Sequence, residues 1–206
     1  KGFPKEPLSP NTKIKFLFGD ILEALLLFLS KEAGHSVEGE QDEIVVNGVV
    51  GHRDAKIDGV TIDVKSASSY SFKKFESGDI LMDDPFGYVA QLSAYDEEGG
   101  AFLVIDKQNG HICLSKVDSD STIDVPYRIS VLRQVLEKSV PPERCFSDEA
   151  EGKSGNRKLG ISCSYCPFKF TCWKDSNNGQ GLRTFAYSTG VKFMTTIVKE
   201  PRVNEN

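Results

Sequence analysis

The sequence predicts an α/β (α+β) fold in the order helix, three antiparallel strands, helix, strand, return strand, helix, followed by a cysteine-ligated lobe and a hairpin. Three Asx-Gly pairs, at 47–48, 58–59 and 109–110, support this order, because both central positions of a two-residue hairpin turn need φ > 0. Helical and alternating apolar periods between the turns supply the other elements. The 206 residues suffice for one domain with its own core, or for one domain with a small appendage.

The composition is that of a globular chain in water, with 39% hydrophobic and 27% charged residues. The longest apolar run, 21–29, contains Glu23 and is too short to span a bilayer, and no signal segment opens the sequence, so we expect no membrane association. The net charge of −5 predicts no general polyanion-binding surface. A nucleic-acid partner would therefore be held by a local basic cleft and by bound metal.

The first expected elements are an arm and a helix. Residues 1–12 contain three prolines and no apolar period, which predicts an extended N-terminal arm. The last residues of the arm can cap a helix that runs to about Ala33, where Gly34 ends it. Its second half is apolar almost all round, so we expect burial on several sides. Glu23 is the exception, because a carboxylate in an apolar helix needs a partner, a proton or a metal.

Three strands follow, at about 38–46, 49–57 and 60–67, and we expect them to form one antiparallel meander. Counting outward from the second turn places Asp54 directly opposite Asp63. Because side chains alternate between faces, one face collects apolar residues and the other collects polar residues. The apolar face carries Ala55, Ile57, Val60, Ile62 and Val64, and the polar face carries His52, Asp54, Lys56, Thr61, Asp63 and Lys65.

The remaining elements follow from local signals. Residues 68–83 are polar and irregular, and Asp84-Pro85 predicts the start of a helix that runs to Gly99-Gly100. A strand at 101–106, a return strand at 111–117 and a helix at 125–138 come next. We therefore divide the chain into an N-terminal arm at 1–12, a core at 13–142, a cysteine lobe at 143–180 and a hairpin tail at 181–206.

The cysteines predict a metal or cluster site. Cys163-x2-Cys166-x5-Cys172 is a strong signal for zinc or for an iron–sulfur cluster, and spacing alone does not decide between them. Cys145 is the natural fourth ligand, whereas Cys113 lies in an apolar strand pattern that is typical of a small core residue. The odd number of cysteines and their clustering favour a reducing compartment over a secreted disulfide framework.

The opposed carboxylates of Asp54 and Asp63 predict a second metal site. Directly opposed residues have Cβ atoms about 4.5–5.5 Å apart, where two bare carboxylates repel. A divalent cation would remove this conflict, and the backbone carbonyl of Val64 would be a further ligand. Lys65 would orient or deprotonate a water, or neutralise developing charge. The alternative is a solvated strand face of mixed charges, and Asp58, which makes the turn, has a structural role.

Two helices offer further candidates for this site. Glu23 could reach the sheet, with Gly19 allowing close approach of the helix to a strand, although a surface stripe that also includes Asp20 is the alternative. Gln91 and Tyr95 share a helix face because they are four residues apart. An amide beside a phenol can bind phosphate oxygens, a nucleobase or a metal-bound water, but such a pair is also common on ordinary helix surfaces.

Three basic residues are candidates for substrate contact. His52 lies on the polar strand face, opposite Lys65 in the predicted register, where substrate contact and a local hydrogen bond are equally reasonable. Lys73 and Lys74 could line a path for phosphates, although most lysines of this kind are solvated surface.

Together these motifs resemble the PD-(D/E)XK nuclease superfamily, in its RecB-like branch, over about residues 13–175. That branch has a G-x-x-D strand, here Gly51 to Asp54, and a (D/E)-x-K strand, here Asp63 to Lys65. A Q-x-x-x-Y helix follows, here Gln91 to Tyr95, and the first helix often carries G-x-x-x-(H/E), here Gly19 to Glu23. Each motif alone is weak, but four in this order are specific. The resemblance implies a restriction-endonuclease-like αβββαβ core.

The cysteine ending resembles the iron–sulfur members of the same branch, including the AddB nuclease domain and the CRISPR-associated nucleases that trim new spacers. In those families a fourth cysteine before the nuclease core completes a 4Fe-4S cluster. This chain departs from that pattern, because no cysteine precedes Cys113. Either Cys145 substitutes, or a leading residue is missing, or the site holds zinc. A stand-alone chain of this size also resembles the RecB-like exonucleases encoded by bacteriophages.

The resemblance implies a DNA exonuclease that depends on Mg²⁺ or Mn²⁺ and acts on single strands or duplex ends, in the cytoplasm of a bacterial cell or a phage-infected host. Asp54, Asp63 and Glu23 would hold the metal, Lys65 would assist the water, and Gln91 and Tyr95 would position the strand. A spacer-trimming nuclease that works in a recombination or adaptation complex is one alternative. A non-catalytic DNA-binding module organised by its cysteines is another.

Overall fold

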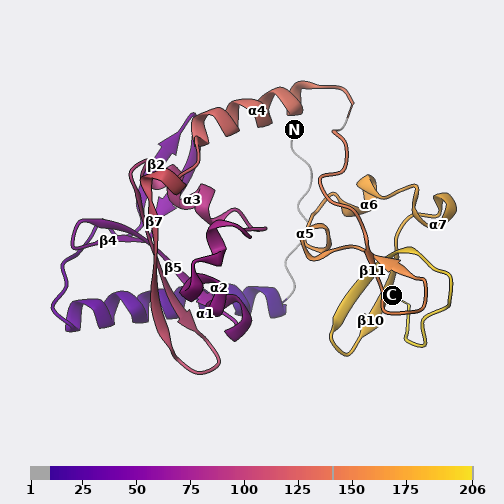
Figure 1. Cartoon of the computed structure of the whole chain (residues 1–206), viewed down its shortest axis with the longest axis horizontal. Coiled ribbons are helices and arrows are strands. Elements are labelled where there is room, and N and C mark those ends of the chain that lie inside the picture. Colours follow the sequence, from indigo (N-terminus) through magenta and orange to yellow (C-terminus); the bar gives the residue numbers. More distant parts are fainter. Residues whose placement is uncertain (1–9, 141, 206) are drawn as a thin grey trace. The chain divides into compact units, whose positions relative to one another are not determined.

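Figure 1 shows the computed structural model of the chain, which describes residues 10–140 and 142–205. The chain divides into two compact units between Glu137 and Lys138. Most of the predicted arm, up to Ser9, lies outside the described residues. No helix in the described part is long and apolar enough to cross a membrane.

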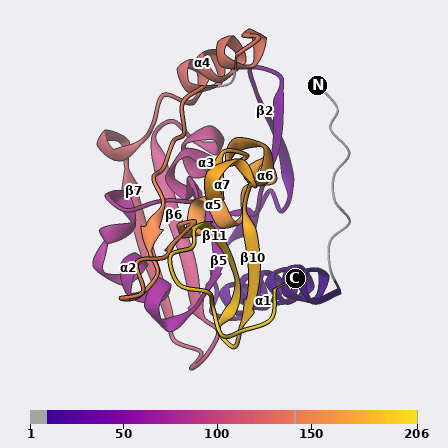
Figure 2. The same cartoon turned by 90° about the vertical axis from the view of Figure 1, so that its right-hand side faces the viewer.

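The first unit is built on a five-stranded mixed sheet in the order β1–β4–β5–β6–β7. Its strands are β1 (Val37–Glu38), β4 (Ala55–Ile57), β5 (Val60–Ala67), β6 (Gly99–Asp106) and β7 (Ile112–Asp118). The central strand β5 is antiparallel to β4 and parallel to β6, and β7 returns antiparallel to β6 (Figure 2). Helices combined with a mixed sheet confirm the predicted α+β class.

The predicted turn at 58–59 is confirmed. Asp58 and Gly59 have φ angles of 50° and 82°, and the strands pair in the predicted register, with Ile57 opposite Val60. A second predicted turn, at 47–48, joins β2 (Asp42–Val46) to β3 (Val49–Arg53), again with both φ angles positive.

The prediction of one continuous three-strand meander is wrong, because β2 and β3 form a sheet of their own. The chain bends at Asp54, between β3 and β4, and at 39–41, between β1 and β2. Asp54 occupies the corner: its Oδ2 accepts a hydrogen bond from the Val64 amide (2.7 Å), and its carbonyl accepts one from the Gln41 amide (3.2 Å). These bonds end the β4–β5 ladder at Ala55.

The first helix, α1 (Pro10–Glu32, indigo in Figure 1), ends near the predicted position, with Gly34 at φ 92°. The prediction that it is buried on several sides is wrong. Leu26 and Leu27 are buried, but Phe18, Ile21 and Phe28 are all more than half exposed. The reason is that, within the first unit, α1 contacts mainly β1 and β5, so only one stripe of the helix is buried.

Residues 68–83 contain a helix that the sequence analysis missed, α2 (Ser69–Ser77), followed by a 3-10 turn, η1 (Asp79–Leu81). The Ser68 side chain caps the helix by accepting a hydrogen bond from the Ser71 amide, and Gly78 ends it at φ 80°. Phe72 and Phe75, one turn apart, are buried on its inner side. A short polar helix with two apolar anchors has too weak a period to be recognised by pattern.

Two further helices complete the first unit. α3 (Tyr88–Tyr95) begins later than predicted, because Gly87 has φ 78° and the Asp84 carboxylate accepts hydrogen bonds from the Gly87 and Val89 amides. α4 (Val125–Glu137) matches its prediction, with the Asp124 side chain accepting from the Tyr127 amide. The core lies between the sheet and the helices α2 and α3, and it consists of Ala67, Phe72, Phe75, Ile80, Val89, Leu92, Phe102, Val104 and Val117.

The second unit contains a four-stranded sheet in the order β10–β11–β9–β8. Its strands are β8 (Glu149–Ala150), β9 (Arg157–Lys158), β10 (Arg183–Tyr187) and β11 (Gly190–Thr196). The predicted final hairpin is the pair β10 and β11 (Figure 2), and its second strand pairs with β9 of the cysteine segment. Three short helices carry the rest of that segment: α5 (Ile161–Ser164), α6 (Lys169–Cys172) and α7 (Ser176–Gly179).

Candidate active site at the corner of the sheet

Asp63 lies on the central strand β5, and its side chain has no exposed surface. Lys65 Nζ lies 2.6 Å from Asp63 Oδ2, yet neither carboxylate oxygen accepts a well-formed hydrogen bond from any described residue. A buried carboxylate without such bonds is costly, because it has lost its hydration and gained little in return. Asp63 is therefore an acidic side chain at a site where burial disfavours its charged form.

Burial raises the pKa of Asp63 from its ordinary value of 3.8 to about 6. The charge of Lys65 opposes this rise, whereas the carboxylates of Asp54 and Glu23 increase it. The three acids therefore feel one another's charge although they come from a strand, a corner and a helix. A divalent cation bound among them would reduce this repulsion.

Asp54 stands at the corner rather than within the strand pair, so the prediction that it directly faces Asp63 in the ladder is wrong. Its Oδ2 accepts the Val64 amide, as described above, which leaves Oδ1 without a hydrogen bond among the described residues. Burial raises the pKa of Asp54, and the Val64 amide and the Lys65 charge partly offset that rise. Asp54 is thus held near Asp63 by its hydrogen bond to the Val64 amide rather than by pairing within a strand ladder.

Glu23 on α1 is the third acid. Its Oε1 accepts a hydrogen bond from Gln41 Nε2 (2.7 Å), and its pKa is raised by burial and then by the charge of Asp54. The sequence analysis did not single out Gln41, which lies in the bend between β1 and β2. The expected close approach at Gly19 is wrong, because a side chain there would meet nothing within 4 Å.

The acids fit a hard divalent cation by the chemistry of their donors. Within residues 10–140 and 142–205, no group of three or more His, Cys, Asp or Glu side chains is arranged so that it could hold a metal ion. Oxygen donors are nevertheless present: Asp63 has Lys65 at Oδ2 and no hydrogen-bond partner at Oδ1, and Asp54 and Glu23 each use only one oxygen in a hydrogen bond to a described residue. Carboxylate oxygens of this kind are the ligands that Mg²⁺ and Mn²⁺ prefer.

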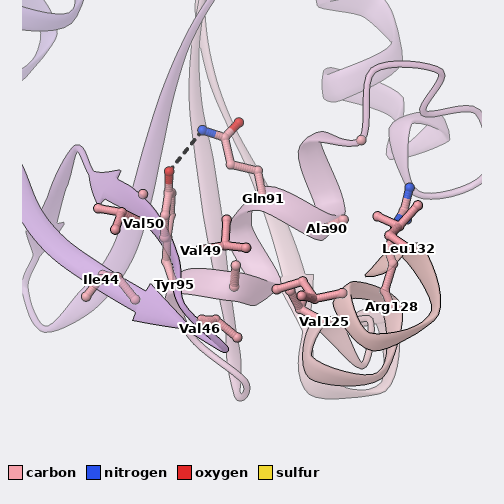
Figure 3. A pocket seen from close by; sticks show the side chains of 14 residues that line it. Ile44, Val46, Val49, Val50, Ala90, Gln91, Tyr95, Val125, Arg128 and Leu132 are labelled. Carbon is pink, nitrogen blue, oxygen red and sulfur yellow. Dashed lines mark hydrogen bonds between the residues drawn. The ribbon is translucent and has the colours of Figure 1, made fainter. Parts of the chain in front are cut away.

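Lys65 links the acids to α3. Its Nζ donates a hydrogen bond to Gln91 Oε1 (3.2 Å), and Gln91 Nε2 donates to the Tyr95 hydroxyl (3.1 Å; dashed in Figure 3). Lys65 Nζ also lies 4.9 Å from the centre of the Tyr88 ring. Tyr88 was missed by the sequence analysis, although its spacing of three from Gln91 and seven from Tyr95 puts all three on one helix face.

A steric contact explains the glycine at position 51, in the middle of β3. A Cβ atom at Gly51 would stand 3.0 Å from the Tyr95 ring and 3.3 Å from its hydroxyl oxygen. The Tyr95 ring therefore packs directly on the β3 backbone, and this contact fixes the position of α3 relative to the corner. In the G-x-x-D motif, Gly51 thus makes room for the Tyr95 ring, and Asp54 belongs to the acid cluster.

Other predicted site residues are not brought to the acids by any contact described. His52 is exposed and pairs with Glu43 on β2, so the prediction that it lies opposite Lys65 is wrong. Lys74 forms an ion pair with Asp83, and its neighbour Lys73 is exposed on α2. Their roles in substrate contact stay predictions, as does the role of the Val64 carbonyl.

The structural role predicted for Asp58 is confirmed. Its carboxylate lies 2.7 Å from His35 Nδ1 and accepts a hydrogen bond from the Ser36 amide (2.9 Å). These contacts tie the β4–β5 turn to the end of α1 and hold the pKa of Asp58 below its ordinary value. Asp58 thus positions the strand that carries Asp63 and takes no part in the acid cluster.

The Cys163 thiol lies close enough to three other cysteines of the second unit to be affected by their charge. Burial raises the pKa of the Cys163 thiol, a hydrogen bond from Trp173 lowers it, and the thiols of Cys166, Cys172 and Cys145 raise it again. Cys113, by contrast, is packed against the core of the first unit, as its strand pattern predicted.

Arg144 brings the segment that carries Cys145 to the other cysteines. Its Nε and one terminal nitrogen donate to the Cys172 carbonyl (3.1 and 2.8 Å), and its guanidinium lies 4.1 Å from the centre of the Trp173 ring. Trp173 is buried beside the Cys163 thiol. The donor chemistry fits a metal that prefers sulfur ligands, with Cys145 as the fourth donor.

Comparisons with known proteins leave this chain without an assigned family. No family model matches it, and no curated protein matches it. The crystal structure of a protein named SSO0001 aligns with a TM-score of 0.40 and 20% sequence identity, over 78% of this chain and 69% of that chain. A similarity this weak says nothing about the family or the function of this chain.

Proposed function

We propose that this chain is a metal-dependent DNA nuclease, an exonuclease that hydrolyses phosphodiester bonds in single strands or at duplex ends. The observation that carries the proposal is Asp63: a fully buried carboxylate that has Lys65 as its partner at Oδ2 and no hydrogen-bond partner at Oδ1 among the described residues, beside two further acids. A structural role alone would favour an apolar side chain at this position, because a buried ion pair often fails to offset its own desolvation. Within the proposal, the enzyme works in the cytoplasm of a bacterial cell or a phage-infected host.

Asp63, Asp54 and Glu23 would hold Mg²⁺ or Mn²⁺. Such an ion, when bound, lowers the pKa of a coordinated water and neutralises charge on a phosphate. Lys65 holds a proton at Nζ and can donate a hydrogen bond to an oxygen that gains negative charge. Gln91 orients Lys65 through its amide oxygen, and Tyr95 orients Gln91, so α3 sets the direction of the lysine.

Two substitutions test the assignment on end-labelled single-stranded and duplex DNA with Mg²⁺ or Mn²⁺. Asp63→Ala is expected to reduce cleavage to background, and Lys65→Ala to slow it by about 10²–10⁴-fold, the range for loss of a positioned proton-transfer group. Asp118→Ala and Lys116→Ala, which change an exposed pair at the same spacing on β7, serve as matched controls. Undiminished cleavage by both site variants, with circular dichroism showing a native fold, would exclude this site.

The same assay separates the alternatives. A wild-type chain that binds DNA but never cleaves it with Mn²⁺ would be a non-catalytic binding module. Cleavage that appears only with an added recombination or adaptation protein would favour a spacer-trimming nuclease that works in a complex.

We also propose that Cys145, Cys163, Cys166 and Cys172 bind a 4Fe-4S cluster or Zn²⁺. The effect of Cys145, Cys166 and Cys172 on the Cys163 thiol and the Arg144 contact to the Cys172 carbonyl support this proposal. Metal analysis and an absorption spectrum of anaerobically purified protein would distinguish the two cofactors. A chain with neither metal would contradict both.

A further inference from the structure

An apolar cavity of about 320 Å³ opens beside the candidate active site (Figure 3). The β2–β3 hairpin, α3 and α4 form its walls. Fourteen residues line it, and only Gln91, Tyr95 and Arg128 among them carry a polar head group. Small-molecule sites have volumes of about 300–1,000 Å³ and similar linings, mainly apolar with a few polar groups. The cavity therefore has room for a single planar ring system rather than for a folded partner.

One side chain, Gln91, links the cavity to the acid cluster. Gln91 lines the cavity, and its amide oxygen accepts the hydrogen bond from Lys65, whose Nζ lies 2.6 Å from Asp63. Figure 3 shows the Gln91–Tyr95 hydrogen bond on one side of the cavity and Arg128 with Leu132 on the other. A strand with a phosphate at the acids would thus have its neighbouring nucleotide at the cavity.

The walls are held in place before any ligand binds. Asn47, at the tip of the β2–β3 hairpin, donates a hydrogen bond from its side chain to the Pro126 carbonyl (3.2 Å), and its own carbonyl accepts one from Arg133 on α4. The tip is therefore attached to α4 through both the side-chain amide and the backbone carbonyl of Asn47. A preformed cavity loses less conformational entropy on binding than one that must be assembled.

The lining is exposed to water although it is apolar. Val49 and Leu132 are 50% and 54% exposed, and they face the cavity from the hairpin and from α4. Arg128 is exposed as well, and its guanidinium forms no ion pair with any residue that the structure describes. An apolar surface with an uncommitted cation at its edge matches a ligand that has a flat apolar body and an attached anion.

We propose that this cavity receives one unpaired nucleobase of the substrate strand, next to the phosphate that is cleaved. The inference rests on the proposed function. The base faces contact Val49 and Leu132, the Gln91 amide and Tyr95 hydroxyl reach the base edge, and Arg128 contacts the following phosphate. A base inside a duplex cannot enter, because its faces and edges are already occupied by its neighbours and its partner. The cavity therefore selects single strands and frayed ends.

The test uses short single-stranded oligonucleotides that carry one abasic nucleotide, moved stepwise along the strand. Wild-type protein with Mn²⁺ is expected to cleave at least about tenfold more slowly when the abasic nucleotide occupies one particular position beside the cleaved bond, because the apolar contact of the base with Val49 and Leu132 is lost there. Leu132→Asp and Val49→Asp should cleave normal and abasic strands at the same slow rate. Both positions are half exposed, so both variants are expected to fold.

Leu136→Asp is the matched control, because Leu136 lies one turn further along α4, is 72% exposed and does not line the cavity. It should retain the wild-type preference. Equal cleavage at every abasic position by wild type would overturn the inference while leaving the nuclease assignment intact, as would equal behaviour of Leu132→Asp and Leu136→Asp. Failure of wild type to cleave any strand would overturn the nuclease assignment and this inference together.

Discussion

At the scale of single residues, the metal binding proposed for Asp63 would conflict with stability. The carboxylate is fully buried and lacks well-formed hydrogen bonds, and one lysine balances three acids. The protein keeps this arrangement although an uncharged side chain would cost less to bury. Its raised pKa makes the conflict measurable, because the folded and unfolded chains release the Asp63 proton at different pH values.

Asp63→Asn is expected to stabilise the metal-free protein at pH 7.5 by up to roughly 3 kcal/mol, the equivalent of a pKa raised from 3.8 to about 6. Between those pH values the folded state binds the Asp63 proton more tightly than the unfolded state does. The unfolding free energy of wild type therefore falls as pH rises from about 4 to 6, and the advantage of the variant should vanish near pH 4. Urea denaturation with EDTA at both pH values measures the difference.

Asp118→Asn on the exposed face of β7 provides the control and should change stability little at either pH. Mn²⁺ should stabilise wild type but not Asp63→Asn, because binding to the folded state alone shifts the unfolding equilibrium. An Asn variant that is less stable than wild type at pH 7.5 would show that Asp63 is favourably paired.

At the scale of elements, the corner at Asp54 and the contact of β3 with α3 position the site together. At the corner between β3 and β4, the Asp54 side chain reaches the central strand β5 and accepts a hydrogen bond from the Val64 amide. Gly51, three residues earlier, lets the Tyr95 ring lie on the β3 backbone. Tyr95 is hydrogen-bonded to Gln91, and Gln91 to Lys65. The spacing between β3 and α3 therefore affects the position of the Lys65 side chain.

Gly51→Ala tests whether the β3–α3 contact controls the position of Lys65. The added methyl group would stand 3.0 Å from the Tyr95 ring, so the ring and α3 must shift by a few tenths of an ångström. Misplacement of catalytic groups by about 1 Å can cost 10²-fold in rate, so we expect a loss on the order of tenfold in kcat, with little change in Tm. Gly19→Ala, whose methyl group would meet nothing within 4 Å, should leave kcat unchanged. Equal rates for the two variants would show that the β3–α3 contact does not govern Lys65.

At the scale of the whole molecule, the sequence predicted what local signals determine. The turn at 58–59, the end of α1 and the start of α4 depend on a few adjacent residues, and all were predicted correctly. The bend at Asp54 was missed, because it depends on a hydrogen bond to Val64 that no periodicity reveals. The exposure of α1 was missed for a related reason: an apolar helix predicts burial, but only the fold shows how many of its sides are covered.

The same distinction applies to the candidate site. Asp63 and Lys65 were identifiable because strand alternation places them on one face of β5. Both β5 and its parallel neighbour β6 contact α3. Gln41 and Tyr88 were missed because their importance comes from contacts with Glu23 and Lys65, which are distant in sequence. Sequence patterns thus found the charged groups, and the structure supplied the side chains that orient them.

The division between Glu137 and Lys138 places the acid cluster and the four cysteines in different units, so loss of the metal proposed at the cysteines should destabilise the second unit only. Metal binding by thiolates contributes directly to folding free energy in small lobes with few apolar residues. Cys163→Ala is expected to lose the iron or zinc and to raise hydrogen–deuterium exchange throughout 143–196, with exchange in β5 and β6 unchanged. Cys113→Ala, in the core of the first unit, should keep its metal. Equal metal content in the two variants would contradict the assignment of the four cysteines.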